Sequence, residues 1–187
     1  MVKNIVNKSE YAEIVPAYIR NNKQYYHLNI NPQEIADSDM CVVLSHIYDH
    51  YPTHEDKDKL YADYLALCKK VKVTEVERYD KSENVNGLYL AGQHCWLDKA
   101  TRVGLVNSIA IEKAAGKTET TLYLNGTALT IGIEQAQQML AALELYALDC
   151  YRKTEEHKAT INALNTIEEV ENYDCTQGYP EQLHLEV

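Results

Sequence analysis

Three histidines spaced by four residues are the first side chains that could do chemistry. His46, His50 and His54 would share one face of a helix, and imidazoles at that spacing can bind zinc. Pro52 interrupts the helix that this arrangement requires, and no Glu follows the first histidine as it does in zinc-protease motifs. We therefore interpret the three as solvated or capping histidines and expect no metal here.

A thiol nucleophile is the second possibility, because His94 stands next to Cys95. Neighbouring residues of a strand point to opposite faces, so these two cannot form a nucleophile–base pair by themselves. A small metal- or thiol-dependent hydrolase that uses the His46–His54 region or Cys95 is therefore the least favoured of our hypotheses. We expect a protein that is not an enzyme, with no catalytic residue and no cofactor.

The chain has five cysteines, an odd number, and no Cys-x-x-Cys pair. Widely scattered cysteines argue against a disulfide framework and against structural zinc. We predict buried free thiols at Cys41, Cys68, Cys95, Cys150 and Cys175.

Composition excludes several classes of partner. The 187 residues allow one domain or two small ones, and the net charge of −10 argues against a nucleic-acid or anionic-membrane binder. The start of the chain predicts no secretion signal, and no run of about 18 apolar residues predicts a membrane span, so we expect folding in a cytoplasm. Fifteen Tyr, one Trp and no Phe suit surfaces that partners cover. A lineage preference for Tyr over Phe explains this composition equally well.

The first half of the chain mixes strand and helix signals. Residues 13–20 and 24–30 predict a hairpin that turns at 21–23, with Pro16 on an edge. Asn31-Pro32-Gln33-Glu34 predicts the start of a helix or a turn, and for the apolar run 40–51 we favour a helix.

After Pro52, Thr53 can cap a helix whose apolar side holds Leu60, Tyr64, Leu67, Cys68 and Val71. Residues 73–79 alternate as a half-buried strand does, and the polar stretch from 80 to 86 predicts a linker. We accordingly divide the chain into an N-terminal α/β attachment region (1–80), a linker (81–86) and a C-terminal α+β domain (87–187).

The C-terminal half begins with a hairpin of residues 88–90 and 94–97. Asp98 can then cap a helix that runs to about Ala115, with Gly116 as its stop. Its apolar side is predicted to hold Ala100, Val103, Val106, Ala110 and Ala114. Asp98 and Arg102 lie one turn apart, and a cap that pairs with an arginine explains them without a function.

Asn125-Gly126 predicts a type I′ turn between strands 120–124 and 127–131. The resulting register places four apolar residues on one face, which needs a cover: Leu122, Leu124, Leu129 and Ile131. After the long helix that follows, Thr166 and Glu169 predict a capping box for one short helix, and residues 174–180 predict a loop.

The longest element is predicted from Ile133 to Leu164. One stripe at helical spacing is formed by Ala136, Leu140, Leu143, Ala147, Cys150, Thr154, His157, Ile161 and Leu164. Four further apolar residues widen this face in the first half: Met139, Leu145, Tyr146 and Leu148. At about 1.5 Å per residue the helix spans roughly 48 Å.

The sequence allows two interpretations of the more polar second half of this helix. It either projects towards a neighbouring subunit or is the solvated end of a core helix. Our hypothesis is a contact surface formed by Leu143, Tyr146, Ala147, Cys150, Tyr151, His157 and Ile161. The fold class is α+β: an N-terminal β-hairpin with two helices, then two β-hairpins packed on helices that include this long amphipathic one.

The order of segments from about Leu88 to Asp174 resembles an uncharacterised domain at the C-terminal end of tail-associated proteins of bacteriophages and prophages. The resemblance is carried by Leu-Tyr-Leu-Ala-Gly-Gln-His-Cys-Trp-Leu-Asp, Thr-Leu-Tyr-Leu-Asn-Gly-Thr and Ala-Thr-Ile-Asn-Ala-Leu-Asn-Thr-Ile-Glu-Glu-Val. In that family a short aromatic hairpin precedes an Asp-x-x-Ser/Thr-Arg helix start, here Asp98, Thr101 and Arg102. The resemblance covers about half of the chain, and the family has no established catalytic residues.

This resemblance implies a virion structural protein of the tail, baseplate or fibre-attachment region. Such a protein is made in the bacterial host cytoplasm and forms a homo-oligomer with protein–protein contacts to other phage structural proteins. An assembly chaperone that holds a tail fibre and is absent from the finished virion is the alternative.

Overall fold

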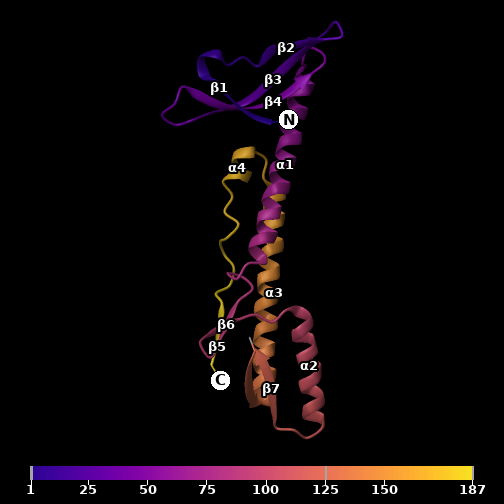
Figure 1. Cartoon of the computed structure of the whole chain (residues 1–187), viewed down its shortest axis with the longest axis vertical. Coiled ribbons are helices and arrows are strands. Elements are labelled where there is room, and N and C mark those ends of the chain that lie inside the picture. Colours follow the sequence, from indigo (N-terminus) through magenta and orange to yellow (C-terminus); the bar gives the residue numbers. More distant parts are fainter. Residues whose placement is uncertain (1, 125, 187) are drawn as a thin grey trace. The chain divides into compact units, whose positions relative to one another are not determined.

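The computed structural model describes residues 2–124 and 126–186 and is α+β, as the sequence predicts. The chain forms two compact units (Figure 1). Unit 1 comprises residues 1–71 and 165–172, and unit 2 comprises residues 72–164 and 173–187. This division differs from the predicted one, because its first break lies inside a helix and a short later segment returns to unit 1.

Unit 1 is built on a four-stranded antiparallel sheet of order β1-β4-β3-β2 (Figure 1). Its strands are β1 (Val2–Asn7), β2 (Ile14–Arg20), β3 (Lys23–Glu34) and β4 (Met40–Tyr48), and a short 3₁₀ helix η1 (Lys8–Glu10) follows β1. The predicted hairpin is confirmed as β2 and β3. Its two-residue turn has positive φ at Asn21 (50°) and Asn22 (58°), and Pro16 lies on the edge strand β2.

Two predictions for unit 1 are wrong. The run 40–51, which fits a helix or a strand and for which we favour a helix, holds the strand β4 in its residues 40–48. The pairing of β4 with both β1 and β3 buries Val43 and Leu44. A short apolar run fits either element, so partners distant in sequence decide. The helix or turn predicted to begin at Asn31 is instead an irregularity inside β3, where Asn31 has φ 51° and the register shifts between Ile30 and Gln33.

Helix α1 (His54–Asp80) begins as predicted, with the Thr53 hydroxyl accepting a hydrogen bond from the Asp56 backbone N–H (3.3 Å). It continues through residues 73–79, so the strand predicted there is wrong. Val73, Val76 and Tyr79 are spaced by three, and the helical period therefore accommodates the same apolar residues.

The core of unit 1 packs α1 and α4 (Ile167–Glu171) on one face of the sheet, through Leu28, Ile30, Leu44, Leu60 and Ile167. Of the predicted apolar side of α1, Tyr64 and Cys68 pack against this core, but Leu67 and Val71 are exposed. The capping box of Thr166 and Glu169 is present at the start of α4.

Unit 2 holds two small sheets and two helices that pack together, α2 (Lys99–Ala114) and α3 (Ile133–Ala163). The hairpin of β5 (Leu88–Leu90) and β6 (Gln93–Cys95) is confirmed, and β9 (Leu183–Leu185), which the sequence did not predict, extends it in parallel to β5. Asp98 caps α2, as predicted, by accepting from the Thr101 N–H (2.9 Å), and Gly116 follows with φ 81°.

Strands β7 (Glu119–Leu124) and β8 (Thr127–Gly132) pair in the predicted register, with Leu122 opposite Leu129. Asn125 of the predicted type I′ turn and the side chain of Leu124 lie outside the described residues. Leu122 and Ile131 are buried, so the hairpin does turn an apolar face to the interior.

Seven of the nine residues of the predicted α3 stripe are buried: Ala136, Leu140, Leu143, Cys150, Thr154, His157 and Ile161. Ala147 is half-buried, and Leu164 is half-buried just beyond the end of the helix at Ala163. Met139 and Tyr146 widen the buried face, whereas Leu145 and Leu148 are exposed. The predicted linker is also part of this core, because Val85 is buried and its carbonyl accepts from the Tyr146 hydroxyl (2.7 Å).

Two leucines on α3, one buried and one exposed, test which side of this helix packs against the core. Leu143 is 1% exposed and Leu145 is 63% exposed. Leu143→Ala is expected to lower the free energy of unfolding by about 2–5 kcal/mol, because it leaves a cavity. Leu145→Ala is expected to change it by less than about 0.5 kcal/mol. Urea unfolding followed by the fluorescence of Trp96, which packs against the core of unit 2, measures both; equal losses would contradict the assignment.

Candidate functional site

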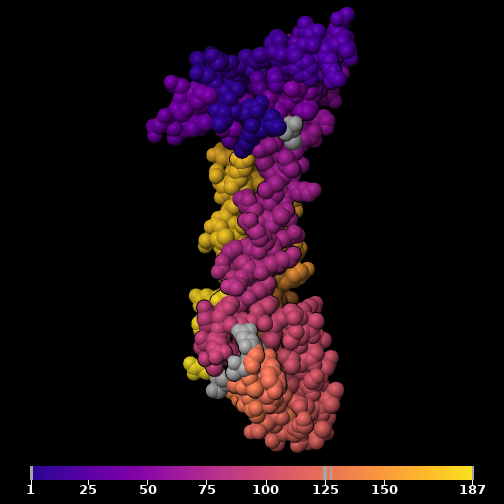
Figure 2. Space-filling view, viewed as in Figure 1, coloured from indigo at the N-terminus to yellow at the C-terminus, as the bar shows by residue number. Residues whose placement is uncertain are grey.

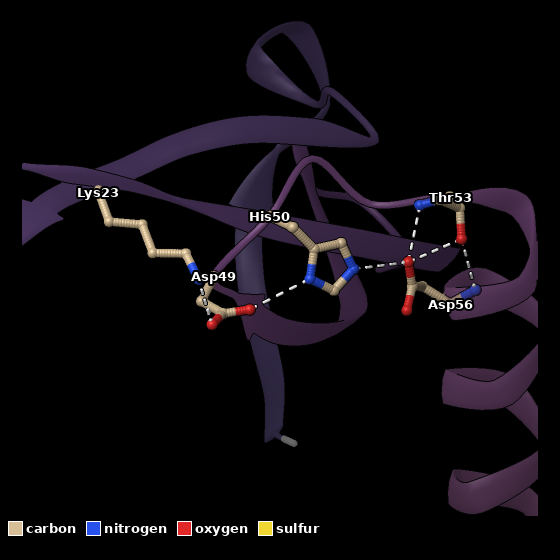
Figure 3. A network of polar contacts seen from close by, with 5 residues as sticks. All are labelled: Lys23, Asp49, His50, Thr53 and Asp56. Atoms are coloured by element: carbon tan, nitrogen blue, oxygen red, sulfur yellow. Dashed lines mark hydrogen bonds and ion pairs between the residues drawn. The ribbon is translucent and has the colours of Figure 1, made fainter.

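A polar network in unit 1 surrounds His50, between the end of β4 and the start of α1 (Figure 3). The imidazole contacts two carboxylates: Nδ1 lies 3.1 Å from Asp49 Oδ1 and Nε2 lies 3.0 Å from Asp56 Oδ2. Carboxylates only accept hydrogen bonds, so both ring nitrogens donate and the ring is favoured as imidazolium. Lys23 on β3 completes the chain of contacts by donating to Asp49 (2.6 Å).

The pKa values in this network follow from those hydrogen bonds. Hydrogen bonds first to Asp56 and then to Asp49 raise the pKa of His50. Donation from the Thr53 backbone N–H and hydroxyl, and then from His50, lowers the pKa of Asp56 to about 2. The Lys23 ammonium lowers the pKa of Asp49. The arrangement fixes charge at the N-terminus of α1, where carboxylates are favoured by the helix dipole.

The three histidines spaced by four do not share one helix face. His46 lies on β4 with its ring 4.9 Å from that of Tyr48, His50 lies in the loop that follows, and His54 begins α1 beside Asp58. The His46 and His50 rings both contact the Tyr48 ring, with His50 5.4 Å from it, but the three histidines come from a strand, a loop and a helix and not from one helix face. Among residues 2–124 and 126–186, no group of three or more His, Cys, Asp or Glu is placed to hold a metal ion.

The thiol possibility is also weakened by the geometry. Cys95 lies opposite Leu88 and is buried, whereas its neighbour His94 lies opposite Tyr89, so the two side chains point to opposite faces of the sheet. Burial raises the pKa of the Cys95 thiol, which disfavours the reactive thiolate. The five cysteines are free thiols, and all but Cys68 are buried.

A cavity of about 570 Å³ lies on the sheet of unit 1, under the segment that crosses from β1 to β2. Its lining includes Asn4, Tyr11, His27 and Asn29. Tyr11 donates to the Asn29 carbonyl (3.2 Å), and the Asn29 amide donates to the Ala12 carbonyl (3.0 Å). These hydrogen bonds hold the crossing segment on the sheet, so the lining serves the fold.

The contact surface predicted on α3 needs correction. Leu143, Tyr146, Cys150, His157 and Ile161 are buried, Ala147 is half-buried, and Tyr151 alone of the seven is exposed, at 60%. The sequence identified the amphipathic face correctly, but that face is covered within the chain.

Leu143→Glu is therefore expected to unfold unit 2 and not to release soluble subunits.

The polar half of α3 is covered by the C-terminal segment of unit 2. Thr154 donates to Asp80 (2.7 Å) and also contacts the Tyr179 hydroxyl (2.9 Å). His157 Nε2 lies 2.9 Å from the Gln177 carbonyl and therefore donates, so Nδ1 accepts from Tyr173 (2.7 Å) in the neutral ring.

Burial lowers the pKa of His157, consistent with that tautomer. The sequence predicts a loop at residues 174–180 and does not identify these partners of Thr154 and His157. A signal was present, because polar residues within a buried stripe require hydrogen-bond partners from elsewhere in the chain.

The predicted apolar side of α2 is turned to solvent, with Val103 50% and Val106 46% exposed. Arg102 is buried, with 5% of its surface exposed, and faces α3 instead. Its Nε donates to Glu144 (2.7 Å), and its Nη1 donates to the Leu97 carbonyl (2.7 Å). Arg102 therefore pairs with Glu144 of α3 and not with Asp98 as predicted, and this ion pair joins α2 to α3.

Exposed apolar residues also follow the outer side of α3, where Leu145 (63%), Leu148 (41%) and Tyr151 (60%) are spaced by three. We call the exposed residues Val103 and Val106 of α2 together with Leu145, Leu148 and Tyr151 of α3 the outer helix surface. The sequence predicts Val103, Val106, Leu145 and Leu148 on apolar faces of their helices and Tyr151 in the contact surface.

No protein-family model, curated protein or solved structure matches this chain. Within the described residues, no helix combines the length and the apolar character needed to cross a membrane.

The raised pKa of His50 predicts a pH-dependent contribution to stability. A histidine whose pKa is higher in the folded chain stabilises it fully below the unfolded value, about 6.5, and this contribution is lost as pH rises through the folded pKa. The stability difference between the wild type and His50→Gln is therefore expected to be larger at about pH 5.5 than at about pH 8.5.

Thermal unfolding of both proteins across this range measures the difference. His46 and His157 have lowered pKa values and give the opposite trend, but they are present in both proteins and cancel. A difference that is constant with pH would contradict the network of Figure 3.

Proposed function

We propose that this chain is a structural protein of a bacteriophage virion, a component of the tail, baseplate or fibre-attachment region. It acts through protein–protein contacts with copies of itself and with other structural proteins, after synthesis in the host cytoplasm. The proposal joins a surface seen in unit 2 to the resemblance of residues 88–174 to a domain of phage tail-associated proteins.

The observation that carries the contact role is the outer helix surface. Leu145, Leu148 and Tyr151 are neighbours along one side of α3, and each is at least 41% exposed. Leaving such side chains in water forgoes about 25 cal/mol for each Å² of apolar area that a partner could cover. Grouped apolar residues at a surface are typical of sites where proteins bind one another.

The phage context comes from the resemblance, and the residues that carry it have physical roles here. Asp98 and Thr101 form the cap of α2, and Arg102 anchors α2 to α3 through Glu144 and the Leu97 carbonyl. The motif therefore sets the position of α2 on α3, and with it the orientation of the outer helix surface.

Mass spectrometry of virions purified from the source strain tests the location. We expect peptides of this chain in the particle at a ratio to other structural proteins that is constant between preparations. Detection in the lysate but not in washed virions would contradict the proposal and favour the tail-fibre assembly chaperone.

Substitution of the outer helix surface tests the contact role. The double variant Leu145→Glu with Leu148→Glu is expected to shift the chain to smaller assemblies, because charges replace the apolar contact area, while its circular dichroism stays unchanged. Size-exclusion chromatography with light scattering measures the mass. Ala159→Glu, at another exposed position of α3, is the matched control and is expected to assemble as the wild type does. Equal assembly of all three proteins would exclude this surface as the contact.

A further inference from the structure

The sheet of unit 1 has two edges, formed by β1 and β2. The outer side of an edge strand presents backbone N–H and C=O groups that another strand can pair with. Proteins commonly protect such edges with proline, bulges or outward-facing charges. The two edges of this sheet differ in these protections, and the difference points to a partner.

Edge β2 is protected. Pro16 lacks an N–H group, and the register with β3 shifts between Pro16 and Tyr18, so the outer side of the strand is irregular. Arg20 adds a charge at the end of the strand. A further strand could not follow this edge for its full length.

Edge β1 has none of these protections. Its residues pair with β4 in one unbroken register from Val2 to Asn7, and the strand contains neither Pro nor Gly. Val2 is 55% exposed and Ile5 is 62% exposed. In Figure 2 the darkest indigo atoms, which belong to the start of the chain, lie on the surface that faces the viewer.

The one charged residue of β1 does not protect the edge either. Lys3 points to the face of the sheet that carries α1 and α4, where its Nζ donates to Glu171 (2.7 Å) and lies 5.7 Å from the centre of the Tyr64 ring. The hydrogen bond to Glu171 raises the pKa of Lys3, so the pair stays charged and internally balanced. Two copies of this strand can therefore approach without repulsion between their lysines.

We propose that β1 pairs with β1 of a second copy, antiparallel and edge to edge, so that two four-stranded sheets become one sheet across a two-fold axis. An antiparallel pair of identical strands satisfies the same groups on both copies, which is the isologous contact of most homodimers. Centred on Asn4, the pairing places Val2 opposite Val6 and Lys3 opposite Ile5. This covers both exposed apolar residues of the strand.

The size of the contact sets its strength. Six residues of strand extend about 20 Å, which buries far less area than the roughly 1,200–2,000 Å² of stable complexes. The dimer therefore forms with weak, concentration-dependent affinity, and other contacts reinforce it. The inference rests on the self-assembly part of the proposed function, and it assigns that assembly a surface separate from the outer helix surface.

Sedimentation velocity of the full chain over a wide concentration range tests the pairing, in the Leu145→Glu, Leu148→Glu background that removes the other proposed contact. We expect a monomer–dimer equilibrium whose dissociation constant rises at least tenfold in Ile5→Lys, because lysine at an exposed edge position opposes pairing. Ile19→Lys on the protected edge, where Ile19 is 71% exposed, is the control and is expected to dimerise unchanged.

Val2→Lys serves as a second edge variant if Ile5→Lys does not fold by circular dichroism. A monomer at every concentration, or equal effects of Ile5→Lys and Ile19→Lys, would overturn the pairing. Dimerisation through β1 by a chain that is absent from virions would leave the pairing intact and refute the virion role, so the two failures are distinguishable. Binding of β1 to an unrelated extended segment, without self-association, would also overturn it.

Discussion

The continuous buried stripe of α3 is the constraint on which unit 2 depends. A helix of 31 residues is stable in water only when its apolar side is covered, and here the cover comes from several short elements. The β7–β8 hairpin contributes Leu122 and Ile131, the β5–β6 hairpin contributes Leu88 and Cys95, and α2 contributes Ile109. None of these short elements has a core of its own, so each takes its position from α3.

Two buried polar groups set the orientation of those covering elements. Arg102 can be buried because Glu144 and the Leu97 carbonyl receive its donors, and this fixes the rotation of α2 on α3. His157 can be buried because Tyr173 and Gln177 satisfy both ring nitrogens, and this fixes the C-terminal segment on the polar half of α3. Apolar contacts alone allow several rotations, whereas an unsatisfied buried charge or imidazole excludes most of them. The side of α2 that remains exposed follows from the same constraint.

Unit 1 depends on pairing between strands that are distant in sequence. Strand β4 lies between β1 and β3, which places Val43 and Leu44 in the interior and leaves the earliest strand at an edge. The two units thus expose groups of different kinds, apolar side chains on the helices of unit 2 and backbone hydrogen-bonding groups at the sheet edges of unit 1. A protein that acts by assembly can use both, because the first supplies area and the second supplies register.

The sequence by itself determined the features whose causes lie within a few residues. Thr53, Asp98 and Thr166 cap their helices, Asn21-Asn22 and Ala91-Gly92 turn their hairpins, and the period of α3 identifies its buried side. Only the tertiary structure decided that residues 40–48 form a strand, that α1 continues to Asp80, and that Val103 and Val106 face solvent. Caps, turns and periodicity act through neighbours in the chain. The choice between strand and helix for a short apolar run, and the choice of which apolar side is covered, depend on partners far along the chain, which local patterns do not specify.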